Sequence, residues 1–194
     1  MSKFIISKKS WDKIQNYSKY AWEEHGSEIG GFMIVNKDKN GNYEMSEPVI
    51  LEQEISAGNT TITKQALASY YCKTAIENKT DNLHYCWWHS HHTMSAFWSG
   101  TDLTAIEQDK NDDWSCSLVV NLKGEYKFRV SHWQPIETFK DIEITIQDVE
   151  KKVPKAIASE VDKLCTKETT VVTKTPLLNQ VNKSWDNTLW YDRT

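Results

Sequence analysis

Residues 83–102 read LHYCWWHSHHTMSAFWSGTD and carry the strongest structural signal in this chain. The run from Leu83 to Trp88 is short, apolar and bounded by polar residues, which predicts a buried strand. His89 and His91 follow at the end of that strand, two positions apart. Because side chains at positions i and i+2 of a strand point to the same face, both imidazoles can reach one common point. Asp102 then returns a carboxylate after a short loop.

Two imidazoles and one carboxylate are ligands that a catalytic zinc ion takes from a protein when its fourth position stays open for water. The pattern therefore nominates His89, His91 and Asp102 as ligands of Zn²⁺, and the chain as a metal-activated hydrolase. A lone His-x-His would be weak support, but the fixed offsets to Ser99 and Asp102 make the pattern specific. Taken alone, Ser99-x-x-Asp102 also resembles a helix capping box, an alternative that the two histidines at the matching offset weaken.

The same residues resemble the signature of the JAMM (JAB/MPN) zinc metalloproteases. That signature consists of His89-Ser90-His91, seven intervening residues and Ser99-Gly100-Thr101-Asp102. It also includes an upstream glutamate in a segment that turns glycine-rich and then apolar, and Glu28 is the matching residue in 27–35, SEIGGFMIV. The resemblance covers about residues 4–133, and every signature position is filled.

The resemblance implies a role for each of these positions. Glu28 would take a proton from the attacking water and later give it to the leaving amine. Ser99 would donate a hydrogen bond to the developing oxyanion. Glu23 and Glu24 lie close to Glu28 in sequence, but they belong to the solvated face of the preceding helix.

Members of this family typically remove ubiquitin or ubiquitin-like modifiers from lysine side chains, or process peptides. The resemblance thus implies a metallopeptidase or isopeptidase, deubiquitinase-like in its chemistry, that acts on a protein or peptide substrate. The insertions that grip ubiquitin are not recognisable between Asp102 and Trp114, so ubiquitin, another modifier and a peptide remain open. The C-terminal strand of a modifier would add beside an exposed sheet edge and pass Trp98 toward the metal.

Two alternatives to a peptidase also remain open. The chain could be a non-catalytic scaffold or interaction module in a larger complex, for which its aromatic C-terminal tail is suited. Metal binding without hydrolysis is the other, and it requires that Glu28 is not the base.

Hydrophobic periodicity predicts an α/β domain with a mixed sheet and flanking helices. The predicted strands are 4–6, 31–35 paired with 43 onward, 83–88, 114–122 and 125–133, with an extended region at 49–62 that bends near Ala57-Gly58-Asn59. Helices are predicted from Ser10 to about Gly26, from Lys64, and at 101–110 with Leu103 and Ile106 inward. The family resemblance implies a curved sheet with the metal site at its edge.

We expect residues 1–135 to form the metallopeptidase domain and residues 136–194 to be a C-terminal extension. Ile142, Ile144 and Ile146 alternate as a strand would, and residues 149–164 are charged and compatible with a helix. Beyond them, the tail with Trp185 and Trp190 either docks on a partner or on its own domain, or stays loosely ordered.

Composition restricts the class of protein. The chain of 194 residues has a formal net charge of −4 and no basic stripe, so nucleic acid is not an expected partner. No apolar run is long enough for a membrane helix, and the N-terminal apolar stretch is too short for a signal peptide. The four cysteines form no C-x-x-C pair. We therefore expect a cytoplasmic protein with free thiols and no membrane partner.

Overall fold

The computed structural model describes residues 2–79, 83–108, 110 and 113–148. The chain divides into two units, Met1–Glu150 and Lys151–Thr194, and all structural statements below concern the first. The helix predicted at 149–164 and the aromatic tail lie outside the described residues. The division predicted at residue 135 stays a prediction.

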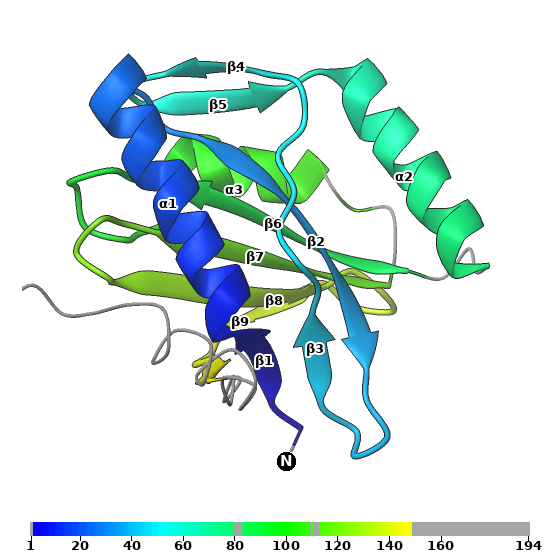
Figure 1. Cartoon of the computed structure of the whole chain (residues 1–194). Coiled ribbons are helices and arrows are strands. Elements are labelled where there is room, and N and C mark those ends of the chain that lie inside the picture. Colours follow the sequence, from blue (N-terminus) through cyan, green and yellow to red (C-terminus); the bar gives the residue numbers. More distant parts are fainter. Residues whose placement is uncertain (1, 80–82, 109, 111–112, 149–194) are drawn as a thin grey trace, which may run out of the picture. The chain divides into compact units, whose positions relative to one another are not determined.

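The described residues form an α/β structure in which three helices are interspersed among the strands along the chain (Figure 1). The strands are β1 Phe4–Ser7, β2 Gly30–Lys37, β3 Tyr43–Met45, β4 Gln53–Ser56, β5 Asn59–Ile62, β6 His84–Ser90, β7 Trp114–Val120, β8 Tyr126–His132, β9 Thr138–Asp141 and β10 Thr145–Gln147; the helices are α1 Lys8–His25, α2 Lys64–Asn78 and α3 Gly100–Gln108. The predicted α/β class is confirmed.

The main sheet is mixed and has eight strands in the order β10-β1-β3-β2-β6-β7-β8-β9. Its central strand β6 is antiparallel to β2 and parallel to β7. Four strands separate β1 from β8, yet the ring of Phe4 lies 5.1 Å from the ring of Phe128. The sheet must therefore curl strongly enough to bring its two halves into contact, which encloses the hydrophobic core.

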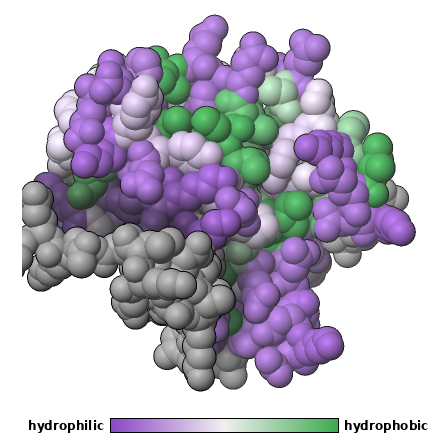
Figure 2. All heavy atoms as spheres, viewed as in Figure 1, coloured by the Kyte–Doolittle hydropathy of each residue, from purple (hydrophilic) through white to green (hydrophobic). Residues whose placement is uncertain are grey.

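Helix α1 covers one face of the sheet and begins earlier than its apolar spacing predicts. The hydroxyl of Ser7, not Ser10, caps its first turn by accepting the backbone N–H of Ser10 at 3.0 Å. Gly26 ends it in the left-handed conformation, φ 60°. Trp11 and Ile14 are buried against the sheet, and Figure 2 shows mainly hydrophilic side chains on the outer side of this helix.

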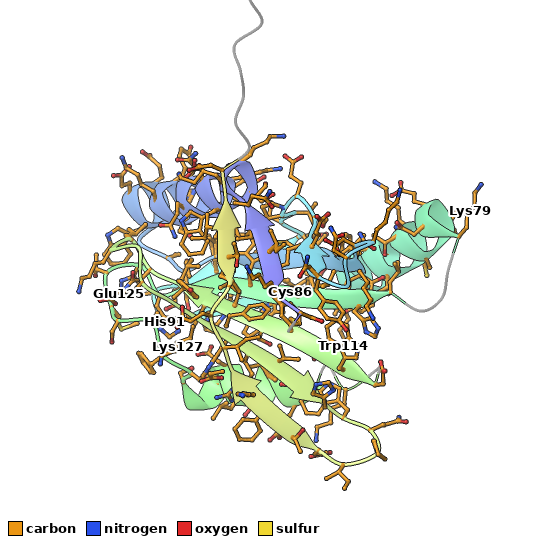
Figure 3. The ribbon with its side chains drawn as sticks, turned by 90° about the horizontal axis from the view of Figure 1, so that it is seen from below. Lys79, Cys86, His91, Trp114, Glu125 and Lys127 are labelled. Atoms are coloured by element: carbon orange, nitrogen blue, oxygen red, sulfur yellow. The ribbon has the colours of Figure 1, made fainter. Side chains whose placement is uncertain are left out.

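The two tryptophans of β6 point to opposite faces of the sheet, as the alternation of side chains along a strand requires. Trp88 is fully buried on the α1 face, where its ring stacks on Tyr17. Trp87 is half-buried on the other face, together with His89, whose ring it stacks on at 4.4 Å. Figure 3 shows α1 and α3 on opposite sides of the sheet, so His89 faces the side that carries α3.

The segment 49–62 bends near Ala57-Gly58-Asn59, as its sequence suggested, and residues 53–62 form a separate hairpin. β4 and β5 pair antiparallel around Ala57 and Gly58 and form a two-stranded sheet of their own. The preceding backbone crosses β2 at Gly31, where an added Cβ would lie 1.9 Å from the carbonyl oxygen of Val49. Glycine at this position is what allows the hairpin to lie close to the main sheet.

The remaining predictions were partly right. The hairpin of β7 and β8 forms around Gly124, which has φ 82° and so needs glycine. In α3, Ile106 is buried as predicted, but Leu103 is 39% exposed because the sheet covers only one side of this short helix.

No helix in the described part of the chain combines the length and hydropathy that crossing a membrane requires.

The sheet continues beyond residue 135. β9 pairs with β8, and β10 pairs in parallel with β1, so residues 138–147 supply strands to both edges of the sheet. Of the three alternating isoleucines, only Ile146 lies in a strand, β10; Ile144 is buried just before it.

Candidate metal centre

The end of β6 delivers the two histidines to one point. His89 is the next-to-last residue of the strand and is aligned with Gly30 of β2 and Val119 of β7. The backbone N–H of His91 donates to the carbonyl oxygen of Val120 at 2.8 Å, so the chain stays extended for one residue past the strand. Both imidazoles are buried, with His91 at the end of the sheet that also carries Glu125 and Lys127 (Figure 3).

Helix α3 delivers the carboxylate, and its first turn is a capping box. The backbone N–H of Ser99 donates to Oδ2 of Asp102 at 2.7 Å, and the backbone N–H of Asp102 donates to the Ser99 hydroxyl oxygen at 3.2 Å. The two interpretations of this motif are therefore not exclusive. Capping fixes the rotamer of Asp102, and the same carboxylate faces the histidines.

The three side chains converge closely. Nε2 of His89 lies 3.2 Å from Nε2 of His91 and 3.1 Å from Oδ1 of Asp102, while Nε2 of His91 lies 3.3 Å from Oδ2 of Asp102. Two ligand atoms of a tetrahedral zinc ion, each about 2.0–2.1 Å from the metal, are about 3.3–3.4 Å apart. The spacing of the donor atoms fits a metal ion, which this buried group could hold.

The protonation of the group suits metal binding. Burial lowers the pKa of His89, which keeps this imidazole neutral with a lone pair to give. Nδ1 of His91 lies 3.3 Å from the carbonyl oxygen of Ser95, a contact that places the proton on Nδ1 and leaves Nε2 as a ligand atom. Burial would raise the pKa of Asp102, but hydrogen bonds with His89 and His91 outweigh it and hold this pKa far below its usual range.

Burial lowers the pKa of His91, but the hydrogen bond with Asp102 and nearby negative charges raise it, and the net shift of this pKa is upward. A metal cation bound between His91 and Asp102 would displace the proton that Asp102 stabilises on His91. Metal binding is therefore expected to release protons.

Glu28 lies two residues before β2, the strand that pairs with β6. The backbone N–H of Ser90 donates to the carbonyl oxygen of Ile29 at 2.9 Å, and the N–H of Ile29 donates to the Ser90 hydroxyl at 3.1 Å. These bonds tie the Glu28 segment to the residue between the two histidines. Glu28 is buried, whereas Glu23 and Glu24 are exposed on α1.

The environment of Glu28 perturbs its carboxyl group. Burial raises its pKa to about 7; the charge of His91 opposes the shift and the charge of Asp102 adds to it. Both charges belong to the converging group, which indicates that Glu28 lies near it. A carboxylate whose pKa lies near neutrality can both accept and release a proton at physiological pH.

Aromatic rings enclose the imidazoles. Trp87 stacks on His89, the Trp98 ring lies 6.3 Å from His89, and the Phe97 ring meets His91 edge-on at 4.8 Å. Phe97 was not singled out from the sequence, although it stands two residues before Ser99.

His92 is not part of the converging group. It has a left-handed backbone, φ 33°, and its ring stacks on Trp22 of α1 at 4.0 Å. Its Nε2 lies 3.2 Å from the carbonyl oxygen of Ala57, in the turn of the β4–β5 hairpin. His92 thus joins α1, the hairpin and the histidine loop, a role that nothing in the local sequence indicates.

Asn121 is a second residue that the sequence did not reveal. Its fully buried side chain donates to the carbonyl oxygen of Met94 at 2.7 Å, which anchors the loop between His91 and Ser99 onto the end of β7.

The comparisons with known proteins agree with this geometry. The model of the family described as prokaryotic homologs of the JAB domain matches residues 12–134, which is more than half of the chain. The matched region includes Glu28, Ser99 and all three converging side chains. A comparison with curated proteins gave no match.

Proposed function

The chain belongs to the family of prokaryotic homologs of the JAB domain, and on this premise we propose that it is a zinc-dependent metallopeptidase. It would hydrolyse an amide or isopeptide bond, with His89, His91 and Asp102 holding the metal. The single observation that carries the proposal is the convergence of these three buried side chains, whose donor atoms lie 3.1–3.3 Å apart.

The residues of the chain divide the chemistry among them. Zinc, when bound, supplies a lowered pKa for the attacking water and polarises the substrate carbonyl. Glu28 accepts the proton of the water as oxygen bonds to the carbonyl carbon, and it returns a proton to the nitrogen as the C–N bond breaks. The hydroxyl oxygen of Ser99 accepts the backbone N–H of Asp102, so its own proton is free to be donated to the negative carbonyl oxygen.

A pocket beside the site supports an extended chain as the acyl part of the substrate. This pocket, the β5 pocket, has a volume of about 720 Å³. It is lined by residues of β5 and α3, among them Thr60 and Thr101, and by Trp87 of β6. Within the described strands, β5 pairs with β4 alone, which leaves its second edge open to a peptide strand. We propose that the C-terminal segment of a ubiquitin-like modifier, or a peptide, binds along that edge.

The decisive test separates metal binding from turnover. Zinc-loaded wild type and Glu28→Gln would be compared on modifier-linked isopeptides and on a peptide mixture, with zinc content measured on the same samples. We expect the variant to keep its zinc and to lose about 10²–10⁴-fold in turnover. Glu24→Gln, which changes an exposed glutamate of α1, is the matched control and should keep full activity.

Equal turnover in Glu28→Gln and wild type would refute Glu28 as the base. A protein that binds zinc but cleaves none of these substrates would favour the scaffold alternative. The cytoplasmic location, and the expectation of no nucleic-acid or membrane partner, stay predictions.

A further inference from the structure

A second pocket lies on the opposite side of α3 from the β5 pocket. It has a volume of about 620 Å³, and we call it the β9 pocket because Phe139 and Asp141 of β9 form part of its wall. Ile106 of α3 lines both pockets, so this helix separates them.

The two pockets flank the segment that contains Ser99. Phe97 and Trp98, directly before it, line the β9 pocket, while Gly100 and Thr101, directly after it, line the β5 pocket. The Phe97 ring meets His91 edge-on at 4.8 Å and the Trp98 ring lies 6.3 Å from that of His89, so two residues that line the β9 pocket also border the candidate metal centre. A substrate with its scissile carbonyl at Ser99 would therefore extend into both pockets, one on each side of the bond.

The side chains that line the β9 pocket favour an apolar substrate group. Phe97 is 43% exposed, Leu103 39% and Phe139 70%, and together they offer an aromatic and aliphatic surface. Charged residues of both signs, Glu107 and Lys127, also line it, so the pocket does not favour a substrate charge of one sign.

The aromatic wall is held in place. The guanidinium of Arg129 lies 5.2 Å from the Trp98 ring and 4.6 Å from the Phe139 ring, and its Nε donates to Asp141 at 2.7 Å. The indole N–H of Trp98 donates to the second oxygen of Asp141 at 3.2 Å. This network fixes Trp98 between the metal centre and β9, and a rigid aromatic wall costs little entropy when a ligand binds.

We infer that the β9 pocket is the subsite for the amine side of the scissile bond and selects a substrate with a large apolar or aromatic side chain there. The inference rests on the proposed function. Because the β5 edge accommodates the extended acyl part, the second pocket at the same centre receives the part that leaves with the amine. Phe139 and Asp141 lie beyond residue 134, outside the region that the family model matches, so part of the wall of this pocket comes from residues after that region.

The test uses the zinc-loaded full chain and a peptide mixture randomised on both sides of the cleaved bond, with cleavage sites read by mass spectrometry. We expect Phe, Leu or Met on the amine side to be preferred over Ala by about tenfold. Phe139→Ala should reduce this ratio below about threefold, because it removes apolar contact area that only a large side chain uses. Ile76→Ala removes a side chain of α2 that is 77% exposed and lines neither pocket, and it should leave the ratio unchanged.

An unchanged ratio in Phe139→Ala, or an apolar preference on the acyl side alone, would overturn the inference. Absence of any cleavage by wild type would instead refute the proposed function, and the pocket would then be tested by binding. N-acetyl-L-tryptophanamide should shift the methyl resonances of Leu103, which lines the β9 pocket and not the β5 pocket, in wild type but not in Phe139→Ala. No shift in wild type would show that the pocket does not select apolar groups.

Discussion

Strand β6 carries a histidine stacked on a tryptophan at each of its ends, and the two ends differ in what surrounds that pair. At one end, the ring of His84 lies 3.9 Å from the ring of Trp114, and its Nδ1 lies 3.2 Å from the Trp114 carbonyl oxygen. Asp113 stands 3.7 Å from the same nitrogen, with a side chain that is 61% exposed.

At the other end, His89 stacks on Trp87 and its Nε2 meets Asp102 at 3.1 Å. Here the carboxylate is buried and a second imidazole, His91, joins the pair. Figure 3 shows His91 and Trp114 at opposite ends of the sheet. A histidine beside a carboxylate and an aromatic ring is thus not sufficient for a metal site; burial and a second converging imidazole distinguish the end that fits one.

Removal of either carboxylate would test this difference most strongly. Asp102→Ala should reduce bound zinc from about one per chain to background, because it removes one of three protein ligands. Asp113→Ala, at the other end of β6, should bind zinc as wild type does. Metal content after dialysis, measured by mass spectrometry, checks both variants. Equal zinc in the two variants would show that the ends of β6 do not differ in this way.

The Ser99 hydroxyl should matter for rate more than for stability. Ser99→Ala should lower kcat by about 10²–10³-fold, since it removes the donor to the oxyanion, and unfolding free energy by about 1 kcal/mol, since it removes the α3 cap. Thr63 caps α2 by accepting the N–H of Ala66, so Thr63→Ala should lose similar stability with full activity. Kinetics and urea unfolding distinguish these outcomes; equal kcat in the two variants would refute the catalytic role.

Glu28 should make the stability of the metal-free protein depend on pH. Its pKa of about 7 in the folded state exceeds its ordinary value of 4.5, so the folded chain holds a proton that the unfolded chain has released. Its contribution therefore becomes less favourable as pH rises from about 4.5 to 7. Glu28→Gln should gain about 1–3 kcal/mol relative to wild type between pH 5 and 8, measured by urea unfolding in EDTA. If the difference in unfolding free energy between Glu28→Gln and wild type did not change with pH, burial would not raise the pKa of the Glu28 carboxyl group.

The exposed pair at the far end of β6 should have the smallest effect. Asp113→Asn removes a charge near His84 in a solvated position, and we expect a change of less than about 0.5 kcal/mol in unfolding free energy. Urea unfolding at low and at physiological salt checks this. A loss above about 2 kcal/mol would mean that the two ends of β6 are more alike than their burial indicates.

Local sequence was enough to predict β6, its two flanking hairpins and the common direction of His89 and His91, whereas Asp102 was assigned to them by the spacing of the motif. A strand fixes the direction of side chains two apart, and a capping motif fixes the start of a helix, so both depend on neighbouring residues only. Ser99 and Asp102 belong both to a helix capping box and to the metal-site signature. The sequence presented these as alternatives, and the structure contains the capping box with its carboxylate facing the histidines.

The pockets and the connections behind the site depend on contacts between distant residues, so the sequence did not reveal them. Leu103 follows the apolar spacing of a helix but is 39% exposed and lines the β9 pocket, a space between α3 and strands β8 and β9. His92 stacks on Trp22, 70 residues away in sequence by their numbers, and its left-handed backbone has no signal in residue type. The pairing of β9 with β8 likewise depends on the tertiary structure and has no signal in the local sequence.

The parallel pairing of β1 with β10 dictates when this chain can finish folding during its synthesis. Ile5 is aligned with Thr145, so the outer edge of β1 has no partner until almost all described residues have left the ribosome. An open strand edge is a template for pairing with other chains, and joining segments so distant in sequence is slow. We therefore expect the nascent chain to need protection from aggregation until a strand made late docks onto the first one made.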